Sequence, residues 1–221
     1  MIHSSSLNQL LLTLLIPVFL FVLLFSWSTA YAVDIYVSVS GSDSNPGTVS
    51  SPLRTVQRAV EVAKTHNANN QPVTITLSAG TYREAVEWSR SGSTTDAPIV
   101  FQASPLGSAI ISGSDVFTDW VSEPQPNLYS HSWNKNWGVP GSLGEPSGEV
   151  TRRREMVFID GGLLTQVTSF NALTDNSFYV DETADKLYIQ TTSNPNESSV
   201  EVGVRQRTFV INRLKNLTVR G

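Results

Sequence analysis

The sequence predicts a mainly β-stranded protein that contains one amphipathic helix and follows an apolar leader. Short segments in which apolar and polar residues alternate recur along most of the chain, separated by Ser, Gly, Pro or Thr. A single segment has the three- and four-residue apolar spacing of a helix. The strand pattern alone is compatible with a sandwich, a barrel or a solenoid.

Composition excludes several classes of protein. The chain has 221 residues, 15 Lys and Arg, 19 Asp and Glu, no Cys and a formal net charge of -4. Without Cys there can be no disulfide framework, thiolate zinc site, iron–sulfur cluster or thiol nucleophile. The scattered Lys and Arg lack the basic surface of a nucleic-acid binder, so no nucleic-acid partner is expected. An apolar fraction of 40% excludes a wholly disordered chain.

The first residues predict export. No Asp, Glu, Lys or Arg precedes Asp34, and residues 10–25 are almost continuously apolar. Ala30-Tyr31-Ala32 then places small residues at the two positions where signal peptidase requires them. We predict a signal peptide at 1–32, cleaved between Ala32 and Val33, and a protein that is secreted or reaches the cell surface or periplasm. The alternative is an uncleaved anchor, but the apolar run is shorter than the roughly 20 residues that span a bilayer. No membrane contact is expected after cleavage.

The first part of the exported chain predicts a strand, a turn and the helix. Ile35, Val37 and Val39 alternate as in a strand, and a Gly- and Ser-rich turn follows at 41–47. Ser51-Pro52 has the chemistry of a helix N-cap followed by Pro at the first helical position. One apolar helix face follows, formed by Leu53, Val56, Ala59, Val60 and Ala63. Further short strands are predicted at 73–77, 82–88, 99–103 and 109–111.

Residues 119–205 predict a small antiparallel β module. Asp160-Gly161-Gly162 separates two apolar strands, which is a hairpin signal because Gly supplies the positive φ of such a turn. A second hairpin is predicted from strands at 178–180 and 186–189, and further strands at 127–133 and 200–204.

Three stretches together resemble secreted, pectate-lyase-like right-handed parallel β-helix proteins. They are residues 36–60, with Gly41-Ser42-Asp43-Ser44-Asn45-Pro46-Gly47; residues 77–84, with Ala79-Gly80-Thr81-Tyr82-Arg83-Glu84; and residues 215–221. In that family they look like the first strand with its capping helix, the first coil and a later coil. The insert at 119–205, with residues 153–161 near its middle, is similar to β-helix glycoside hydrolases that act on xylosides or fucosides. The resemblance covers only the N-terminal portion of such proteins.

The resemblance implies an all-β fold: the start of a right-handed parallel β-helix with an N-terminal capping α-helix and an inserted antiparallel module. The expected divisions are 33–118 for the cap and first coils, 119–205 for the insert, and 206–221 for the resumed β-helix. Residue 219 lies within a strand pattern, so we expect the sequence to be a fragment of a longer chain.

The implied function is that of the N-terminal portion of a secreted carbohydrate-active enzyme that cleaves glycosidic bonds in a polysaccharide, as a glycoside hydrolase does. The alternatives are a polysaccharide lyase of the same fold, for which calcium would be the cofactor, and a non-catalytic glycan-binding surface protein. The family places its active site along later coils, so catalytic residues are expected beyond Gly221 and none is assigned. A monomer with a polysaccharide partner is expected.

Three aromatic residues are candidates for substrate contact: Tyr129, Trp133 and Trp137. Aromatic faces stack on sugar rings, although core packing of the insert explains Trp133 equally well. Glu84 and Glu87 face opposite sides of a strand and are interpreted as surface charge. The two histidines of the exported part are far apart in sequence and no Cys accompanies them, so no metal site is predicted.

Overall fold

The computed structural model describes residues 31–89, 97–135 and 155–221. Val33–Gly221 form one compact unit. Within the described ranges it is built from strands, one α-helix and one short 3-10 helix, which confirms the all-β class. The start of the predicted leader and the Gly- and Pro-rich stretch at 138–148 lie outside the described residues.

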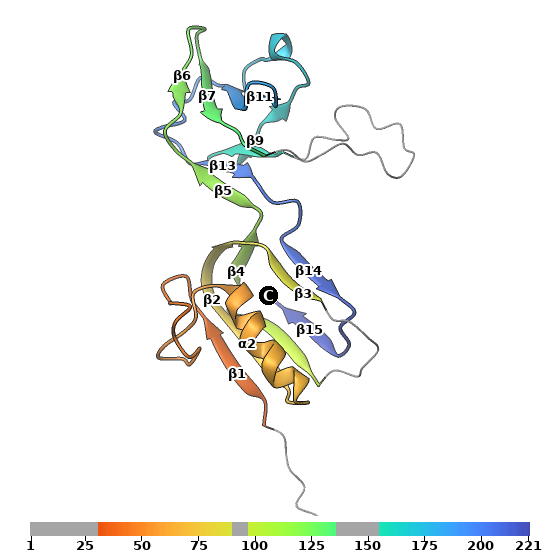
Figure 1. Ribbon diagram of the computed structural model, residues 1–221. Helices are drawn as coiled ribbons and strands as arrows, with labels where there is room; N and C mark the ends of the chain where they lie inside the picture. The colour runs from red at the N-terminus through yellow and green to blue at the C-terminus, as the bar shows by residue number, and fades with distance from the viewer. Residues whose placement is uncertain (1–30, 90–96, 136–154) are drawn as a thin grey trace, which may run out of the picture. The chain divides into compact units, whose positions relative to one another are not determined.

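Strands from successive passes of the chain pair in parallel (Figure 1). One four-stranded sheet has the order β1 (Val33–Val37), β2 (Val73–Arg83), β4 (Ile99–Ser112) and β15 (Leu217–Arg220). Its register places Val73 between Val33 and Ile99, and Ile99 between Val73 and Leu217. A second parallel pair joins β3 (Val86–Ser89) to β14 (Phe209–Asn212). We call these strands together with the helix the coil stack.

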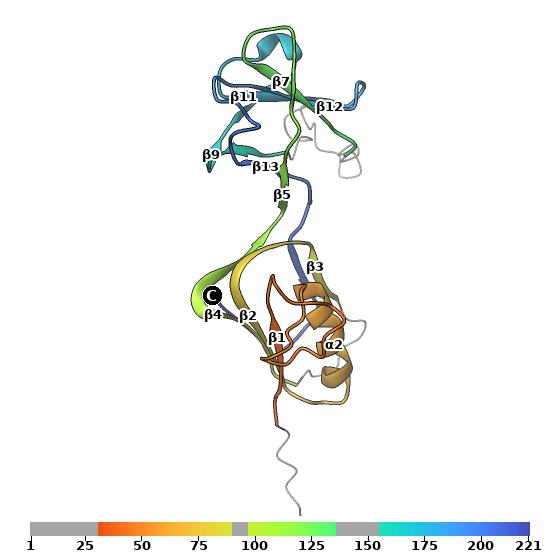
Figure 2. The same cartoon turned by 90° about the vertical axis from the view of Figure 1, so that its left-hand side faces the viewer.

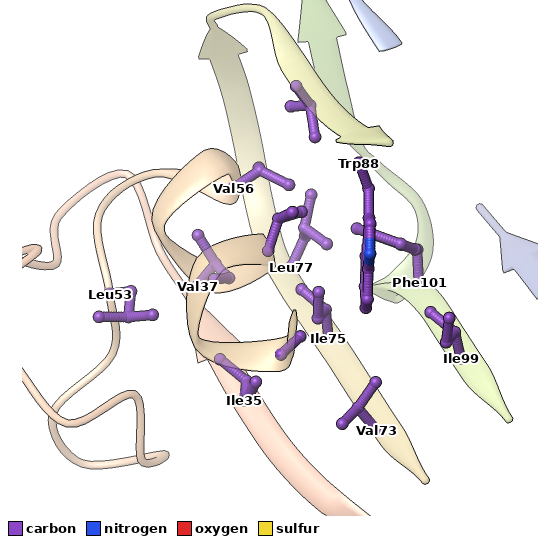
Figure 3. Packing of buried hydrophobic residues seen from close by; sticks show 14 of the residues in the cluster. Ile35, Val37, Leu53, Val56, Val73, Ile75, Leu77, Trp88, Ile99 and Phe101 are labelled. Carbon is purple, nitrogen blue, oxygen red and sulfur yellow. The ribbon is translucent and has the colours of Figure 1, made fainter. Parts of the chain in front are cut away.

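The helix α2 (Val56–Ala68) covers the apolar interior of the coil stack. It contacts β1, β2 and β3, and its buried apolar residues are Val56, Ala59, Val60 and Ala63. Ile35, Ile75 and Ile99 are 0–2% exposed because the same alternate positions of neighbouring strands face inward. Figure 3 shows this interior, including Trp88 beside Phe101.

The helix begins later than the sequence predicts. Thr55 is the N-cap and its side chain accepts a hydrogen bond from the Arg58 N–H; the prediction of Ser51 as N-cap is therefore wrong. Leu53 is buried, but it lies in a β-bridge with Val37, where its N–H donates to the Tyr36 carbonyl. Pairing with β1 holds this segment extended and delays the first helical turn.

The β2 and β4 strands are long and curved (Figure 2). Their pairing continues on both sides of an irregularity between Ser78 and Gly80, where Gly80 has a φ of 148°. The strands predicted at 99–103 and 109–111 are thus parts of one curved strand. Curvature lets one strand contribute to two sides of the coil stack.

The described residues of the insert form two sheets. One has the order β5 (Ser114–Phe117), β13 (Val200–Gly203), β8 (Val157–Ile159) and β9 (Gly162–Leu163), all antiparallel. The other has the order β10 (Thr165–Gln166), β11 (Ser177–Asp181), β12 (Lys186–Gln190), β7 (Leu128–Ser132) and β6 (Val121–Ser122), with the 3-10 helix η1 at Phe170–Ala172.

Both predicted hairpins form in this module, as β8–β9 and as β11–β12. Two details differ from the prediction. The β5 strand precedes residue 119 yet pairs with β13, so the module begins at Ser114. The β10 and β11 strands pair in parallel, so the module is not wholly antiparallel. Its core includes Val157, Phe178, Leu187 and Val200, each 0–1% exposed.

Candidate functional site

Two carboxylates from outside the helix bind its N-terminus. Asp43 Oδ1 accepts from the N–H groups of Arg54 and Thr55 at 2.9 and 2.8 Å, and Asp43 Oδ2 accepts from the Thr55 hydroxyl at 2.9 Å. Glu84 accepts from the N–H groups of Val56 and Gln57 at 2.8 and 2.9 Å. These N–H groups have no partner within the helix and carry its positive dipole end, so anions stabilise it.

The loop that carries Asp43 is held close to the chain before the helix. A Cβ at Gly41 would collide with the backbone of Pro52 and Leu53, so only Gly fits. Asn45 Nδ2 donates to the Pro52 carbonyl at 2.9 Å. Burial alone would raise the pKa of Asp43, but the hydrogen bonds from Thr55 and Arg54 and the charge of Arg58 lower it. The residues of the Gly-Ser-Asp-Ser-Asn-Pro-Gly stretch therefore order the cap.

A polar cleft opens beside this cap, lined by Val39, Asp43, Arg54, Thr55, Thr81, Tyr82, Arg83 and Glu84. The Tyr82 hydroxyl donates to the carbonyl oxygens of Ser78 and Val37, at 2.8 and 3.2 Å. Both carboxylates of the cleft are engaged by backbone N–H groups, so neither is suited to proton transfer. Asp43 and Glu84 are structural residues.

A second polar cluster joins the coil stack to the module. Arg83 Nη2 and Nη1 donate to the two Glu201 carboxylate oxygens at 2.8 and 2.9 Å, and the Ser114 hydroxyl donates to Glu201 Oε2 at 2.7 Å. The hydrogen bond from Arg83 and then that from Ser114 lower the pKa of Glu201 to about 2. Arg205 pairs with Asp115 at 2.8 Å beside them. We call these five residues the junction network.

The two chain connections between the coil stack and the module lie side by side at this point (Figure 1). The N–H groups of Val204 and Arg205 both donate to the Gly113 carbonyl, at 3.0 and 3.2 Å. A Cβ at Gly113 would lie 2.8 Å from the Thr208 methyl group. These backbone contacts hold the two connections together beside the junction network.

A second cleft lies next to the junction network along β3 and β14, lined by Ala85, Val86, Glu87, Arg205, Gln206, Arg207 and Val210. Arg207 is exposed, and no ion pair or hydrogen bond from its side chain occurs among the described residues. Glu87 accepts from the Ser89 hydroxyl at 2.9 Å. A guanidinium and a carboxylate on an open cleft can hydrogen-bond a polar ligand such as a sugar, which makes it a candidate glycan-contact surface.

The three sequence-predicted contact residues have different positions. Trp133 is 2% exposed in the module core, so core packing describes it and its ring offers no face to a sugar. Tyr129 is half-buried and packs against the same core. Trp137 lies outside the described residues and stays a prediction.

Other aromatic residues, which the sequence analysis did not select, lie on the opposite face of the same sheet: Phe170, Tyr179 and Tyr188. The alternation of inward and outward side chains along a strand could have identified Tyr179 from the sequence. Tyr179 stands between Phe178 and Val180, which are 1% exposed, so it must point away from the core.

Metal ligands do not gather in the part of the chain that the structure describes. No group of three or more His, Asp or Glu side chains is placed to hold a metal ion there. Asp181 Oδ1 instead accepts from the N–H groups of Thr183 and Ala184, each at 2.9 Å, which closes the β11–β12 turn. Within the same ranges no helix is long and apolar enough to cross a membrane.

Comparison with known proteins supports a β-helix relationship. Residues 39–88 match a family described as a protein of unknown function (DUF1565), a parallel β-helix family. The chain is 39% identical over 87 residues to the pectate lyase PEL9 of Emericella nidulans and 37% identical over 82 residues to the uncharacterized protein YwoF of Bacillus subtilis. These matches cover 38% and 37% of this chain but only 20% and 16% of the relatives.

Two solved structures share the fold over most of the chain. A complex of XylC with xylose matches with a TM-score of 0.63 and 20% identity, covering 85% of this chain and 34% of XylC. A glycoside hydrolase matches with a TM-score of 0.57 and 15% identity, covering 85% of this chain and 50% of that chain. The chain thus spans half or less of every relative named here. The similarity to these two solved structures shows a shared fold.

Proposed function

We propose that this chain is the N-terminal portion of a secreted enzyme that cleaves glycosidic bonds in a polysaccharide by hydrolysis. The observation that carries the proposal is the combination of a parallel coil stack and an inserted β module in one fold. That fold resembles a xylose-bound protein and a glycoside hydrolase over 85% of this chain.

The parallel pairs are the first coils of a right-handed parallel β-helix. In such a solenoid each strand bonds to the coil above and below, and a cap covers the end. The pairing of β1, β2, β4 and β15 in one parallel sheet and the seal formed by α2 support this reading.

Catalysis belongs to later coils. Glycoside hydrolysis needs an acid and a second carboxylate roughly 5–10 Å apart on either side of the scissile bond. Asp43, Glu84 and Glu201, which line or adjoin the described clefts, are each committed to helix capping or to Arg83. The described residues therefore supply the cap, the scaffold and sugar contacts, and the acid pair is expected in the remaining length that such enzymes have.

Export precedes this function. We place signal-peptide cleavage between Ala32 and Val33, and β1 begins at Val33, so cleavage would leave every described strand intact. Tyr31 is 84% exposed and therefore accessible to a peptidase. N-terminal sequencing of the protein recovered from culture medium or periplasm should start at Val33; a start at Met1 would contradict export by this route.

Sugar release tests the proposal directly. The protein as its source organism makes it should release reducing sugar from at least one polysaccharide in a panel of neutral and uronate polymers, without the ultraviolet absorbance of an unsaturated product. Absence of release from every polymer would contradict an enzymatic role.

A lyase is the second candidate, because the pectate lyase PEL9 is 39% identical over 87 residues. A lyase would remove the proton next to a uronate carboxylate and leave an unsaturated, absorbing product. It would also lose activity when calcium is chelated, whereas the hydrolase would not. Retention of a polysaccharide without any product would instead indicate a glycan-binding protein.

A further inference from the structure

An aromatic patch lies on the outer face of the five-stranded sheet of the module. Tyr179 on β11 and Tyr188 on β12 are directly opposite each other, with ring centroids 6.5 Å apart and ring planes at 13°. Phe170 from η1 meets Tyr188 edge to face, with centroids 5.0 Å apart. The row continues across the sheet to Ser130 and then to Val121, which is 60% exposed.

Folding of the module does not require these rings. The core-facing neighbours of Tyr179 and Tyr188 on β11 and β12 are each 0–1% exposed and fill the interior: Phe178, Val180, Leu187 and Ile189. Phe170 is 36% exposed and belongs to neither core cluster of the described residues. Tyr179 and Tyr188 are half-buried, so each keeps part of its ring at the surface beside Phe170. Aromatic groups gathered at a surface are typical of a binding site, because they present a large apolar area and, for Tyr, a polar hydroxyl.

A paired cation and anion border the rings. Lys186 Nζ lies 5.5 Å from the Tyr188 ring centroid and 3.0 Å from Glu123 Oε1. Lys186 can donate hydrogen bonds and Glu123 can accept them, so the pair matches the neighbouring hydroxyls of one sugar ring. Gln190 on the same face adds an amide, whose Nε2 lies 3.4 Å from the Pro126 carbonyl.

The charge of the β11–β12 hairpin disfavours an anionic ligand. Lys186 is the one basic residue of the β11–β12 hairpin, while acidic residues flank the hairpin and form its turn: Asp175, Asp181, Glu182 and Asp185. A polyanion such as a uronate polymer or a nucleic acid would be repelled by this surface. A neutral pyranose chain has no such penalty, and its C–H faces suit aromatic rings.

We propose that Phe170, Tyr179 and Tyr188, with Lys186 and Glu123, form a binding site for a neutral polysaccharide on the module. The inference deepens the proposed function, because a site that excludes uronate polymers fits a hydrolase of neutral polysaccharide better than a lyase. The rings stack on the apolar faces of successive sugars, and the Lys186–Glu123 pair binds their hydroxyls.

Affinity electrophoresis of the whole protein in native gels tests the site. The probes are a soluble arabinoxylan, a soluble mixed-linkage β-glucan and polygalacturonate. The protein should be retarded by at least one neutral polymer and not by polygalacturonate. The double substitution Phe170→Ala and Tyr188→Ala should weaken that retardation by about tenfold or more in apparent dissociation constant, because it removes two of the three aromatic contact surfaces.

Phe158→Ala is the matched control. Phe158 is a half-buried ring on β8 that lies opposite Glu201, on a strand face outside the module core cluster. It should leave retardation unchanged. If circular dichroism shows that the double variant does not fold, the retardation of the single variant Phe170→Ser tests the site instead. This variant should fold, because the partly exposed Phe170 side chain lies on η1 outside the core.

The gel experiment and the sugar-release experiment test the binding site and the proposed enzymatic function independently. Unchanged retardation in a folded double variant, or retardation by polygalacturonate alone, overturns the site. Reducing-sugar release by the unmodified protein would still support the enzyme in either case. Retardation that depends on the patch, in a protein that releases no sugar, supports the site and contradicts the enzyme.

Discussion

The coil stack and the inserted module have different ways of making a core from short strands. The coil stack pairs strands in parallel across long stretches of chain: Val86 of β3 pairs with Phe209 of β14, which lies beyond the whole module. The module is built mostly from local hairpins, in which Phe178 pairs with Ile189 and Phe158 with Leu163. Their two buried clusters share no residue.

The two regions also differ in what their polar and aromatic side chains do. In the coil stack the helix and the parallel strands enclose the apolar interior, and Asp43 and Glu84 are used to cap that helix. In the module, alternation along β11 and β12 leaves one face for the core and one for aromatic and polar groups at the surface. The four predictions below test how independent the two regions are, from the largest effect to the smallest.

Removing a large ring from either core should produce the largest effect. Trp88→Ala in the coil stack and Phe178→Ala in the module should each cost about 3–5 kcal/mol in the free energy of unfolding of their own region. Hydrogen exchange should show that Phe178→Ala lowers protection in β11 and β12 while β1 and β2 keep theirs. Equal loss of protection in both regions would contradict two independent cores. Leu163→Ala, at a side chain 60% exposed, is the control and should stay within about 0.5 kcal/mol.

Cutting the junction network should weaken the link between the regions. Arg83→Ala removes both hydrogen bonds to Glu201, whose side chain is 35% exposed, so the expected cost is about 1–2 kcal/mol, below that of a fully buried ion pair. Urea unfolding, monitored by tryptophan fluorescence, gives the change in the free energy of unfolding. Arg207→Ala, which removes no described ion pair, should change it by less than about 0.5 kcal/mol. Equal effects of the two substitutions would remove the special role of Arg83.

Loss of the helix N-cap should act on the coil stack alone. Thr55→Ala removes the acceptor for the Arg58 N–H and the donor to Asp43, and should cost about 1 kcal/mol. Thermal unfolding measured by circular dichroism gives the loss of stability. Thr65→Ala at the exposed side of the same helix is the control and should cost nothing, because Ala is the better helix former. Destabilisation by Thr65→Ala of the same size would refute specific capping.

Acid should weaken the junction network by a smaller amount. The pKa of Glu201 is lowered from 4.5 to about 2 in the folded protein, so its contribution is complete above pH 4.5 and is lost as pH falls towards 2. Glu201→Gln should therefore be less stable than the unmodified protein at pH 6, and the difference should shrink at pH 2.5. A difference that is constant with pH would contradict the Arg83–Glu201 ion pair.

Local patterns predicted local structure well. The turn at Asp160-Gly161 forms the β8–β9 hairpin because its backbone requirement is met within a few residues: both have positive φ. The helix start was missed because Leu53 is held by Tyr36 and Val37, a tertiary contact that helix propensity cannot express.

The candidate site was only partly predictable. Trp133 is an aromatic residue expected to contact sugar, but it follows β7, whose pairing with β12 brings it to the core region. Tyr179 and Tyr188 become neighbours only through the register of β11 and β12, and Arg83 meets Glu201 only after the whole insert has folded. Strand register and long-range pairing decide which of these side chains meet, and local sequence patterns carry no information about either.

One measurement tests the central proposal, that the module binds neutral sugar through Phe170, Tyr179 and Tyr188. It is hydrogen exchange of the whole protein with and without a saturating neutral xylo-oligosaccharide or gluco-oligosaccharide. Binding should slow exchange in η1, β11 and β12, around Phe170 and Tyr188, and leave β1 and β2 unchanged. Protection confined to the coil stack, or none with any neutral oligosaccharide, would contradict the account.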